Sequence, residues 1–439
     1  MNIIVAGVGK VGYALAKTLS ANHNVYVIEK NRQLIEKINE SIDVMPIAGD
    51  VVNPQTYEPL EELEFDIFIA VTDSDETNIL STLIADDKIT LKSKIVRLKN
   101  PYFANSTISN KLGIKKSVFP FIATAKSIGS LVEFPKANNV KKIPFSSHKL
   151  ISVRADEAVY KNYNEIEVNN CVVVGFERDR EFHFLNKDYK IEQNDLIYIV
   201  GEKNELKSLC SKLDTNSSLE LKNIAILGAD LLGVEIAKHL ASYNLNIKLF
   251  DKDIKLCKKA SEILSDDALV INSKFIEHNI YEEENIKHAD MVIATSNNDE
   301  SNIIKSIEAK EYGVKKCVAI NNDSAYYDLM YKLGIVAIRG TKTNAYYGIL
   351  ESIASNNIIN EKHFCGGRGV VLIRKIFKDA CVIDREIKLP NSDDILYLII
   401  RDNKIVPIKD SMNLQEDDTF VLFSYTKNEE SLRSWISNL

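Results

Sequence analysis

The sequence lacks the cysteine spacing of a disulfide or zinc framework. Its six cysteines are scattered over 439 residues, and no two of them form a Cys-x-x-Cys pair. This usage is typical of reduced thiols in a cytosolic protein. The seven histidines show no His-Glu-x-x-His or other ligand spacing either. We therefore predict that the protein holds no metal.

The features of membrane-spanning, secreted and nucleic-acid-binding chains are also missing. No apolar run reaches the ~18 residues that a transmembrane helix needs. We expect no signal peptide, because Met1 leads directly into a predicted apolar strand at residues 3–5. With 55 basic and 62 acidic residues the net charge is −7, whereas broad nucleic-acid binding needs a basic surface.

A duplication dominates what the sequence does contain. Residues 3–12 carry a Gly-x-Gly-x-x-Gly pattern, and residues 224–233 repeat the stretch with two of its three glycines. Ser-Asp-Glu-Thr-Asn at 74–78 returns as Asn-Asp-Glu-Ser-Asn at 298–302. The offset between the copies stays at about 222 residues, and such a constant offset predicts two halves built on one plan.

Each half changes its pattern along its length. Short apolar strands first alternate with amphipathic helices, which indicates βαβ units and a parallel sheet, and a strand-rich segment follows. We predict an α/β protein with two Rossmann-like, doubly wound, mainly parallel domains, each followed by a small α+β domain. The predicted domains span residues 1–135, 145–215, 222–355 and 367–439.

The first half carries the signature of a dinucleotide site. Gly7, Gly9 and Gly12 follow a predicted strand and open a predicted helix, where they permit a tight turn, a close approach to pyrophosphate and close helix–strand packing. Glu29 ends the next strand, where a carboxylate accepts ribose hydroxyls and favours NAD over NADP, although Lys30 and Arg32 lie near enough to blur that preference. The alternative is an ordinary helix–strand turn with a surface glutamate.

Three further residues are candidates for the same site. Asp50 follows the third strand, where it can meet the adenine or its ribose or act only as a helix N-cap. Arg97 ends the fifth strand and Lys10 lies within the glycine loop, so either can neutralise phosphate. The alternative for Arg97 is a solvated surface side chain.

The second copy of the site is altered. Asp230 replaces the middle glycine, Lys274 stands in the place of Asp50, and no arginine matches Arg97. Asp251 survives in the place of Glu29. We expect Asp230 to repel a diphosphate, so this second site is predicted to be empty or to bind another ligand.

The sequence shows no catalytic signature beside the nucleotide. No Gly-x-Ser-x-Gly motif occurs, and the strand-rich segments, at about 70 residues each, are too small for a catalytic domain. We predict a nucleotide that is sensed rather than consumed, and no enzyme activity. Two alternatives stay open, an NAD-dependent oxidoreductase with duplicated Rossmann halves and a purely structural assembly protein.

These residues together resemble a known family. Residues 7–12, Glu29, residues 49–50 and residues 70–78 are similar to the nucleotide-binding domain of the RCK (KTN) family. The strand-rich segments resemble its C-terminal domain, in the last copy through residues 387–390, Arg401 and residues 414–418. The tandem order over essentially the whole chain resembles the TrkA-type peripheral regulatory subunits of bacterial Trk potassium uptake systems.

The resemblance implies a ligand, partners and a location. The ligand would be NAD or NADH, with ATP or ADP also possible. The partner would be a potassium-transporting membrane subunit of the Trk/Ktr type, gated by a ring of such domains on the cytoplasmic face of the membrane. A homo-oligomer, dimer or tetramer, is expected, and no nucleic acid. The helices after Asn78 and Asn302 are candidate subunit contacts, or ordinary core.

The resemblance also implies site residues. Glu29 would contact the adenosine ribose, Asp50 would lie near adenine and Arg97 near phosphate. The first site would comprise Gly7, Val8, Gly9, Lys10, Val11, Gly12, Glu29, Asp50, Val51, Thr72, Asp73 and Arg97. A weaker second site would comprise Gly228, Asp230, Gly233, Asp251 and Thr295.

Overall fold

The computed structural model describes residues 1–156, 170–179, 181–185, 190–215, 220–273, 280–354, 359–378, 380, 382–383, 385–390, 394–406, 408 and 411–439. The chain divides into two compact units. The first unit comprises Met1–Thr124 and Arg339–Ile353, and the second comprises Ala125–Ile338 and Ala354–Leu439.

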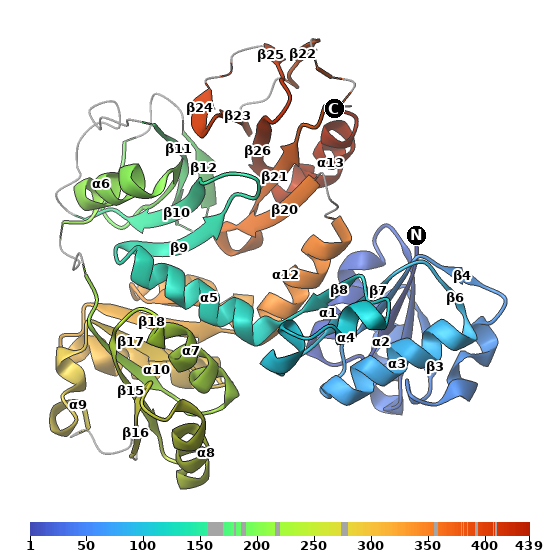
Figure 1. The fold of residues 1–439 in the computed structure, drawn as a ribbon, viewed down its shortest axis with the longest axis horizontal. Coiled ribbons are helices and arrows are strands. Elements are labelled where there is room, and N and C mark those ends of the chain that lie inside the picture. Colours follow the sequence, from blue (N-terminus) through green and yellow to red (C-terminus); the bar gives the residue numbers. More distant parts are fainter. Residues whose placement is uncertain are drawn as a thin grey trace. The chain divides into compact units, whose positions relative to one another are not determined.

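A six-stranded sheet forms the centre of the first unit (Figure 1). Its strands lie in the order β3 (Met45–Ala48), β2 (Asn24–Glu29), β1 (Asn2–Ala6), β5 (Ile67–Ala70), β7 (Lys94–Arg97) and β8 (Lys116–Val118). Every strand pair is parallel. The order reverses between β1 and β5, and in doubly wound sheets such a switch point opens a crevice at the carboxyl ends of the strands.

Helices cover both faces of this sheet because successive strand residues point to opposite sides. Ile3 and Val5 pack with helices α1 (Lys10–Leu19), α2 (Arg32–Ser41) and α12 (Thr341–Ala354). Ile4 and Ala6 pack on the other face with α3 (Asp75–Lys88) and the 3-10 helix η1 (Pro54–Leu60). The smaller elements of this unit are β4 (Glu64–Phe65), β6 (Thr90–Leu91), η2 (Pro101–Ala104) and α4 (Ile108–Lys111).

The second repeat has the same topology. Its sheet has the order β16 (Leu269–Asn272), β15 (Asn246–Asp251), β14 (Asn223–Leu227), β17 (Met291–Ala294), β18 (Lys316–Asn321) and β19 (Val336–Arg339). Its helices are α7 (Leu231–Ala241), α8 (Ile254–Leu264), α9 (Ile280–Glu283), η5 (Ile286–His288), α10 (Asp299–Glu311), η6 (Ser324–Tyr326) and α11 (Tyr327–Lys332). The predicted duplication of a Rossmann-like domain is therefore confirmed.

Two five-stranded antiparallel sheets account for the strand-rich segments. One has the order β12 (Glu181–Phe184), β11 (Cys171–Arg178), β13 (Leu196–Gly201), β10 (Lys149–Arg154) and β9 (Ala137–Lys142), with helix α6 (Lys203–Leu213). The other has the order β20 (Ile359–Phe364), β21 (Gly369–Lys375), β26 (Thr419–Tyr425), β23 (Ile395–Arg401) and β24 (Lys404–Val406). The same segment contains the two-stranded sheet of β22 (Glu386–Lys388) and β25 (Ser411–Asn413). Its helices are η7 (Cys365–Gly367), η8 (Thr426–Asn428) and α13 (Glu429–Ser437). One apolar cluster joins the two sheets, since it contains Val174 and Tyr198 together with Val371 and Phe423. The predicted fold class is confirmed.

The two repeats exchange their last helices. Ala345 and Ile349 of α12, from the second repeat, are fully buried in the core of the first sheet. In the other direction, Gly129 of α5 (Pro120–Glu133), from the first repeat, lies so close to α7 that an added Cβ would come within 2.6 Å of the His239 ring. Within the described residues, no helix has the length and apolar character that crossing a bilayer requires.

Candidate functional site

A cavity opens at the switch point of the first sheet. Its volume is about 620 Å³, and it is lined by residues at or after the carboxyl ends of β1, β2, β3, β5 and β7 and by one residue of α12. This size lies within the range of about 300–1,000 Å³ that is usual for small-molecule sites. The cavity therefore has both the position and the size expected of a nucleotide site in a doubly wound sheet.

The three glycines at the cavity have different roles. Gly7 has a φ of +100°, which a residue with a side chain rarely adopts. A Cβ on Gly12 would lie 1.8 Å from the carbonyl oxygen of Gly7, so only glycine allows α1 to pack this close to β1. A Cβ on Gly9 would meet no described atom within 4 Å, because this position faces open space. Gly9 lines the cavity.

Helix α1 presents its N-terminus to the cavity. Gly9 is its N-cap residue, and no side chain of the described chain caps it by a hydrogen bond. The first N–H groups of a helix have no partner within the helix and carry a partial positive charge. This end of α1 is therefore suited to an anion.

Glu29 supports the glycine loop from the end of β2. Its Oε2 accepts a hydrogen bond from the backbone N–H of Val8 at 2.8 Å, and its Oε1 accepts one from the N–H of Asn31 at 2.9 Å. Asp251 makes the same pair of contacts with Ala229 and Asp253 in the second repeat. The carboxylate thus ties the loop to the sheet and also lines the cavity.

Arg97, the last residue of β7, also lines the cavity. Its side chain is only 7% exposed, and its nearest carboxylate oxygen is Oδ1 of Asp73 at 3.6 Å. Nε of Arg97 has no hydrogen-bond partner within the described part of the chain. Burial lowers the pKa of Arg97, and the Asp73 and Asp75 carboxylates act in the opposite direction. A buried guanidinium with an unused donor at a cavity is an arrangement that an anionic ligand would complete.

Asn78 holds the ends of two strands beside the cavity. Its Oδ1 accepts hydrogen bonds from the N–H of Thr72 at 2.8 Å and from the hydroxyl of Thr72 at 2.7 Å. Its Nδ2 donates to the carbonyl oxygens of Thr72 at 3.1 Å and Arg97 at 2.9 Å. Asn302 makes the equivalent four bonds to Ser296 and Ile320. The repeated Asp-Glu-x-Asn stretch therefore positions the cavity wall.

The same stretch caps α3, as a helix N-terminus signal predicts. The Ser74 hydroxyl accepts from the N–H of Thr77 at 3.1 Å, and Asn298 caps α10 in the second repeat in the same way. The Asp75 carboxylate, buried at 8% exposure, accepts from the N–H groups of Lys99 and Asn100. These bonds fix the loop that follows β7.

The structure brings most of the predicted first-site residues to the cavity. Those that line it are Gly7, Gly9, Lys10, Val11, Glu29, Asp50, Val51, Thr72, Asp73 and Arg97. Val8 and Gly12 do not line it, because Val8 is buried in the core and Gly12 faces the loop backbone. Lining residues outside the predicted set are Ile28, Lys30, Asn31, Leu34, Gly49, Val71, Ser74, Thr77 and Lys342.

The crevice of the second repeat is organised differently. Oδ1 of Asp230 accepts hydrogen bonds from the backbone N–H groups of Leu232 and Gly233, each at 3.1 Å, so that Asp230 caps α7. Burial raises the pKa of Asp230. Burial lowers the pKa of Lys305, while the carboxylate of Asp251 raises it. The carboxylate of Asp230 therefore turns back onto its own helix, which the charge argument from the sequence did not anticipate.

The remaining residues of the predicted second site have the same geometry as their counterparts in the first repeat, except that one set of contacts is made by the next residue along the chain. Gly228, with a φ of +143°, and Gly233, whose added Cβ would lie 1.8 Å from the Gly228 oxygen, repeat the loop geometry. Thr295 is fully buried and its hydroxyl donates to the Gly228 carbonyl oxygen at 3.2 Å. Ser296, rather than Thr295, makes the contacts of Thr72. Lys274 lies outside the described residues.

One group of side chains in the last sheet has the composition of a metal site. The ligand atoms of Glu361, His363 and Glu429 lie within 4.8 Å of one another. However, the Arg433 guanidinium donates two hydrogen bonds to Glu361, at 3.0 and 2.6 Å, and also contacts Glu429. Both carboxylates therefore already have the Arg433 guanidinium as a partner, which makes this group a poor cation site.

Fold and cavity together define a class of protein, a duplicated chain of Rossmann-like domains with small antiparallel domains attached. Comparison with known families agrees with this class. A family model described as the TrkA-N domain matches residues 3–120 and 224–339, which together make up more than half of the chain. The chain belongs to the TrkA-N domain family, as its resemblance to RCK and TrkA-type proteins predicted.

Curated relatives match nearly the full length. A Trk system potassium uptake protein TrkA homolog 1 of Methanosarcina mazei is 24% identical over 442 residues, with 97% of each chain covered. The Trk system potassium uptake protein TrkA of Vibrio alginolyticus is 24% identical, with 97% of this chain and 96% of the relative covered. Among solved structures, the GsuK RCK domain aligns with a TM-score of 0.63 at 16% identity, over all of this chain and 95% of that one, which shows a shared fold.

Proposed function

We propose that this protein is a nucleotide-sensing regulatory subunit of a potassium uptake system. It binds NAD or NADH, or else ADP or ATP, in the cavity of the first repeat, and it acts on a potassium-transporting membrane subunit of the Trk/Ktr type. Its place of action is the cytoplasmic side of the membrane, as a peripheral protein. The relatives' names support the transport system. Solved structures of similar fold carry the titles GsuK channel bound to NAD and GsuK bound to ADP.

One observation carries the nucleotide part of this proposal. One cavity is lined both by the N-terminus of α1, without a side-chain cap from the described residues, and by the buried side chain of Arg97. Two independent groups therefore direct positive charge at one space. Glu29 and Asp50 line the same cavity and offer acceptors for ribose and base. A phosphate-containing ligand with hydroxyl groups matches both sets.

The cavity lining supports sensing rather than catalysis. The described residues that line it include no histidine, tyrosine or cysteine. Hydride transfer to a substrate would need such a group, or another of tuned pKa, beside the nicotinamide. A ligand can then act only through its different affinities for two arrangements of the protein. The structural units of this regulatory subunit would be the four predicted domains, 1–135, 145–215, 222–355 and 367–439.

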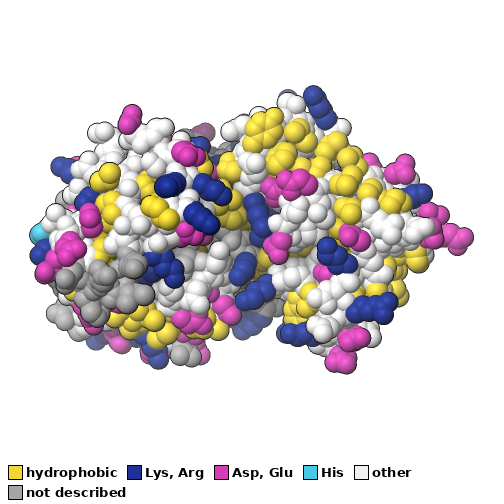
Figure 2. All heavy atoms as spheres, turned by 90° about the horizontal axis from the view of Figure 1, so that it is seen from below, with side chains coloured by type: hydrophobic (Ala, Val, Ile, Leu, Met, Phe, Trp, Pro, Cys, Tyr) yellow, Lys and Arg dark blue, Asp and Glu magenta, His cyan; other side chains and the backbone are white. Residues whose placement is uncertain are grey.

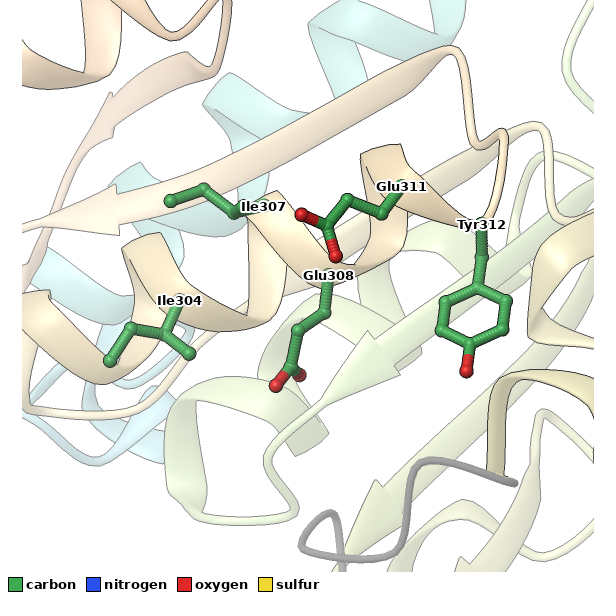
Figure 3. Close-up of a pocket in the computed structure, with 5 residues that line it drawn as sticks. All are labelled: Ile304, Ile307, Glu308, Glu311 and Tyr312. Carbon is green, nitrogen blue, oxygen red and sulfur yellow. The ribbon is translucent and has the colours of Figure 1, made fainter.

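Assembly of several copies forms the second part of the proposal. Leu80 and Leu83 of α3 are 47% and 39% exposed, and Ile304, the equivalent of Leu80 in α10, is 56% exposed. Figure 2 shows hydrophobic side chains gathered on the surface of the first unit. In the second repeat, Ile304 and Ile307 line a surface hollow together with Glu308, Glu311 and Tyr312 (Figure 3). Apolar stripes repeated at equivalent helices suit contacts between copies of this chain.

A thermal-shift titration of the full-length protein tests the nucleotide proposal. NAD, NADH, ADP and ATP are titrated into the wild type, Glu29→Ala and Asp251→Ala. The two variants lose equivalent backbone contacts, so Asp251→Ala controls for the structural effect of the change. We expect a saturable rise in Tm with at least one nucleotide, kept in Asp251→Ala and lost in Glu29→Ala. A flat response of the wild type to all four would overturn the proposal.

A further inference from the structure

One residue of the nucleotide cavity comes from the other repeat. All described lining residues but one belong to residues 7–97, and the exception is Lys342 in the first turn of α12. We propose that Lys342 is a ligand-binding residue of the first site, where its ammonium contacts the phosphates of the nucleotide. This inference rests on the proposed function, and it adds that both repeats build the one site.

The packing of α12 fixes the place of Lys342. Residues three and four apart share one face of a helix, so Lys342 lies on the face of Ala345 and Tyr346. Ala345 is fully buried in a cluster that also holds Val8 of the glycine loop and Val11 of α1. The Tyr346 hydroxyl lies 2.8 Å from the hydroxyl of Thr18, the residue before the last one of α1. The face that carries Lys342 is thus packed against the loop and helix that frame the phosphate position.

Hydrogen bonds hold the start of α12 in place. Nδ2 of Asn344 donates to the carbonyl oxygen of Arg339 at 2.9 Å and to the hydroxyl of Thr124 at 2.8 Å. Thr341 is buried at 5% exposure, whereas Lys342 is half-buried. The backbone at Lys342 is therefore anchored, and its long side chain can follow a ligand in the cavity.

The charge pattern points to an anionic ligand. A lysine in the first turn of a helix opposes the helix macrodipole, which favours acidic residues there. Such a conflict between local preference and fold is expected where a residue serves a function. The negative charge of a phosphate in the cavity would balance the positive charges of Lys342, Lys10 and Arg97. Among the acidic groups of the cavity, Glu29 is engaged by two backbone N–H groups, and the Asp73 side chain is 94% exposed.

Because Lys342 belongs to α12, ligand binding at this site can influence parts of the chain outside the first repeat. Residues Arg339–Ile353, which include nearly all of α12, belong to the first unit, while Ala125–Ile338 and Ala354–Leu439 belong to the second. A nucleotide that touches both the glycine loop and Lys342 acts on the segment that connects the two units in sequence. Such a ligand favours arrangements in which α12 stays seated on α1.

Equilibrium binding by the full-length chain tests the inference. NADH and ADP are titrated into the wild type, Lys342→Gln, Lys342→Arg and Lys17→Gln, the last a control at an exposed lysine of α1. We expect Lys342→Gln to weaken binding roughly tenfold, because a charge-assisted hydrogen bond is lost. Lys342→Arg should stay within about threefold of wild type, and Lys17→Gln should be unchanged. The difference in affinity between the wild type and Lys342→Gln should become smaller at high salt, because salt screens the charge of Lys342.

A second measurement distinguishes a direct contact between Lys342 and the nucleotide from an effect of the substitution on the stability of the protein. In the wild type, NADH should slow amide hydrogen exchange in residues 7–12 and also in residues 341–350. In Lys342→Gln at saturating NADH, only residues 7–12 should be slowed. Wild-type affinity and wild-type protection of α12 in Lys342→Gln would overturn the inference and leave the proposed function intact. If the wild type binds neither ligand, the proposed function fails, and the role of Lys342 fails with it.

Discussion

The carboxylate of Asp230 accepts a hydrogen bond from the backbone N–H of Gly233, at 3.1 Å, at the start of helix α7. In the first repeat the equivalent position is Gly9, and α1 has no side-chain cap from the described residues. The backbone is nearly the same at both positions, with φ and ψ of −67° and −173° at Gly9 and −72° and −177° at Asp230. The loop before α7 thus caps its helix with the Asp230 carboxylate, whereas the loop before α1 leaves the first N–H groups of the helix open to the cavity.

We predict that Gly9→Asp converts the first loop into the second. An added Cβ at Gly9 meets no described atom within 4 Å, and aspartate already adopts this backbone conformation at residue 230. The new carboxylate should cap α1, so the protein should fold and gain a few tenths of a kcal/mol. Nucleotide binding should be lost, because the carboxylate occupies the anion position and repels phosphate.

Gly9→Ala is the matched control for this variant, since it adds the Cβ without the charge. It should bind nucleotide measurably, more weakly than wild type. Binding is measured by NADH fluorescence, and stability by urea denaturation. Undiminished binding in Gly9→Asp would show that no phosphate lies at this loop.

Asn78→Ala should destabilise the first repeat strongly. Asn78 is 1% exposed and makes four hydrogen bonds, to the backbone and hydroxyl of Thr72 and to the Arg97 carbonyl. Leaving these buried backbone groups without partners should cost about 2–4 kcal/mol. Urea denaturation measures the loss, and Asn302→Ala should show a similar one. Asn110→Ala, at an exposed position of α4, serves as the control. A cost below about 0.5 kcal/mol would mean that Asn78 is not a structural clamp.

Stability of the last sheet should depend on pH through Glu361. Burial, together with the Glu429 carboxylate, raises the pKa of Glu361 to about 7, although Arg433 opposes this. His363 and Glu430 are the other titratable groups near this cluster. The unfolded chain releases this proton near pH 4.3, so the folded state binds the proton more tightly. The free energy of unfolding should therefore fall as pH rises from about 4.5 to 7, by up to about 1.4 kcal/mol per pH unit, and level off above the folded pKa.

The sole tryptophan reports this transition locally, since Trp435 lies in α13 with Glu429 and Arg433. Urea unfolding followed by its fluorescence is compared between the wild type and Glu361→Gln from pH 5 to 8. The difference between the two proteins should change across this range, whereas Glu416→Gln, at an exposed glutamate, should run parallel to wild type. If Glu361→Gln also runs parallel, Glu361 is ionised throughout.

Charge introduced on the apolar stripes should break the assembly. Leu83→Glu combined with Ile304→Glu places carboxylates on the exposed faces of α3 and α10. Light scattering after gel filtration should then give the mass of one chain, 49.5 kDa, whereas the wild type should give a multiple of it. Met45→Glu, at a 57% exposed position of β3, is the control. An unchanged mass in the double variant would place the subunit contacts elsewhere.

Much of the fold follows from local sequence, because the determinants of a doubly wound domain are short. The glycine loop, the acidic residue at the end of β2 and the apolar strands each lie within a few residues. Their repetition at one offset also reveals the duplication. Ten of the lining residues between 7 and 97 could be named for the same reason, since a parallel sheet brings the carboxyl ends of its strands together.

Tertiary relationships account for what the sequence did not reveal. Lys342 reaches the site only because α12 packs on the other repeat, and helical periodicity does not say which partner a helix chooses. The predicted repulsion by Asp230 assumed a carboxylate that points into the cavity, whereas the structure turns it onto the N–H groups of Leu232 and Gly233. The role of Asn78 likewise depends on β7, which arrives later in the chain.

The stoichiometry of nucleotide binding tests the central claim most directly. Isothermal titration of NADH, NAD, ADP or ATP into the full-length chain should give one nucleotide per chain for the ligand that binds. The second repeat should contribute none, because Asp230 caps its own helix and Ile320 stands at the position of Arg97. Gly9→Asp should abolish the signal. Two nucleotides per chain, or one that persists in Gly9→Asp, would contradict the account.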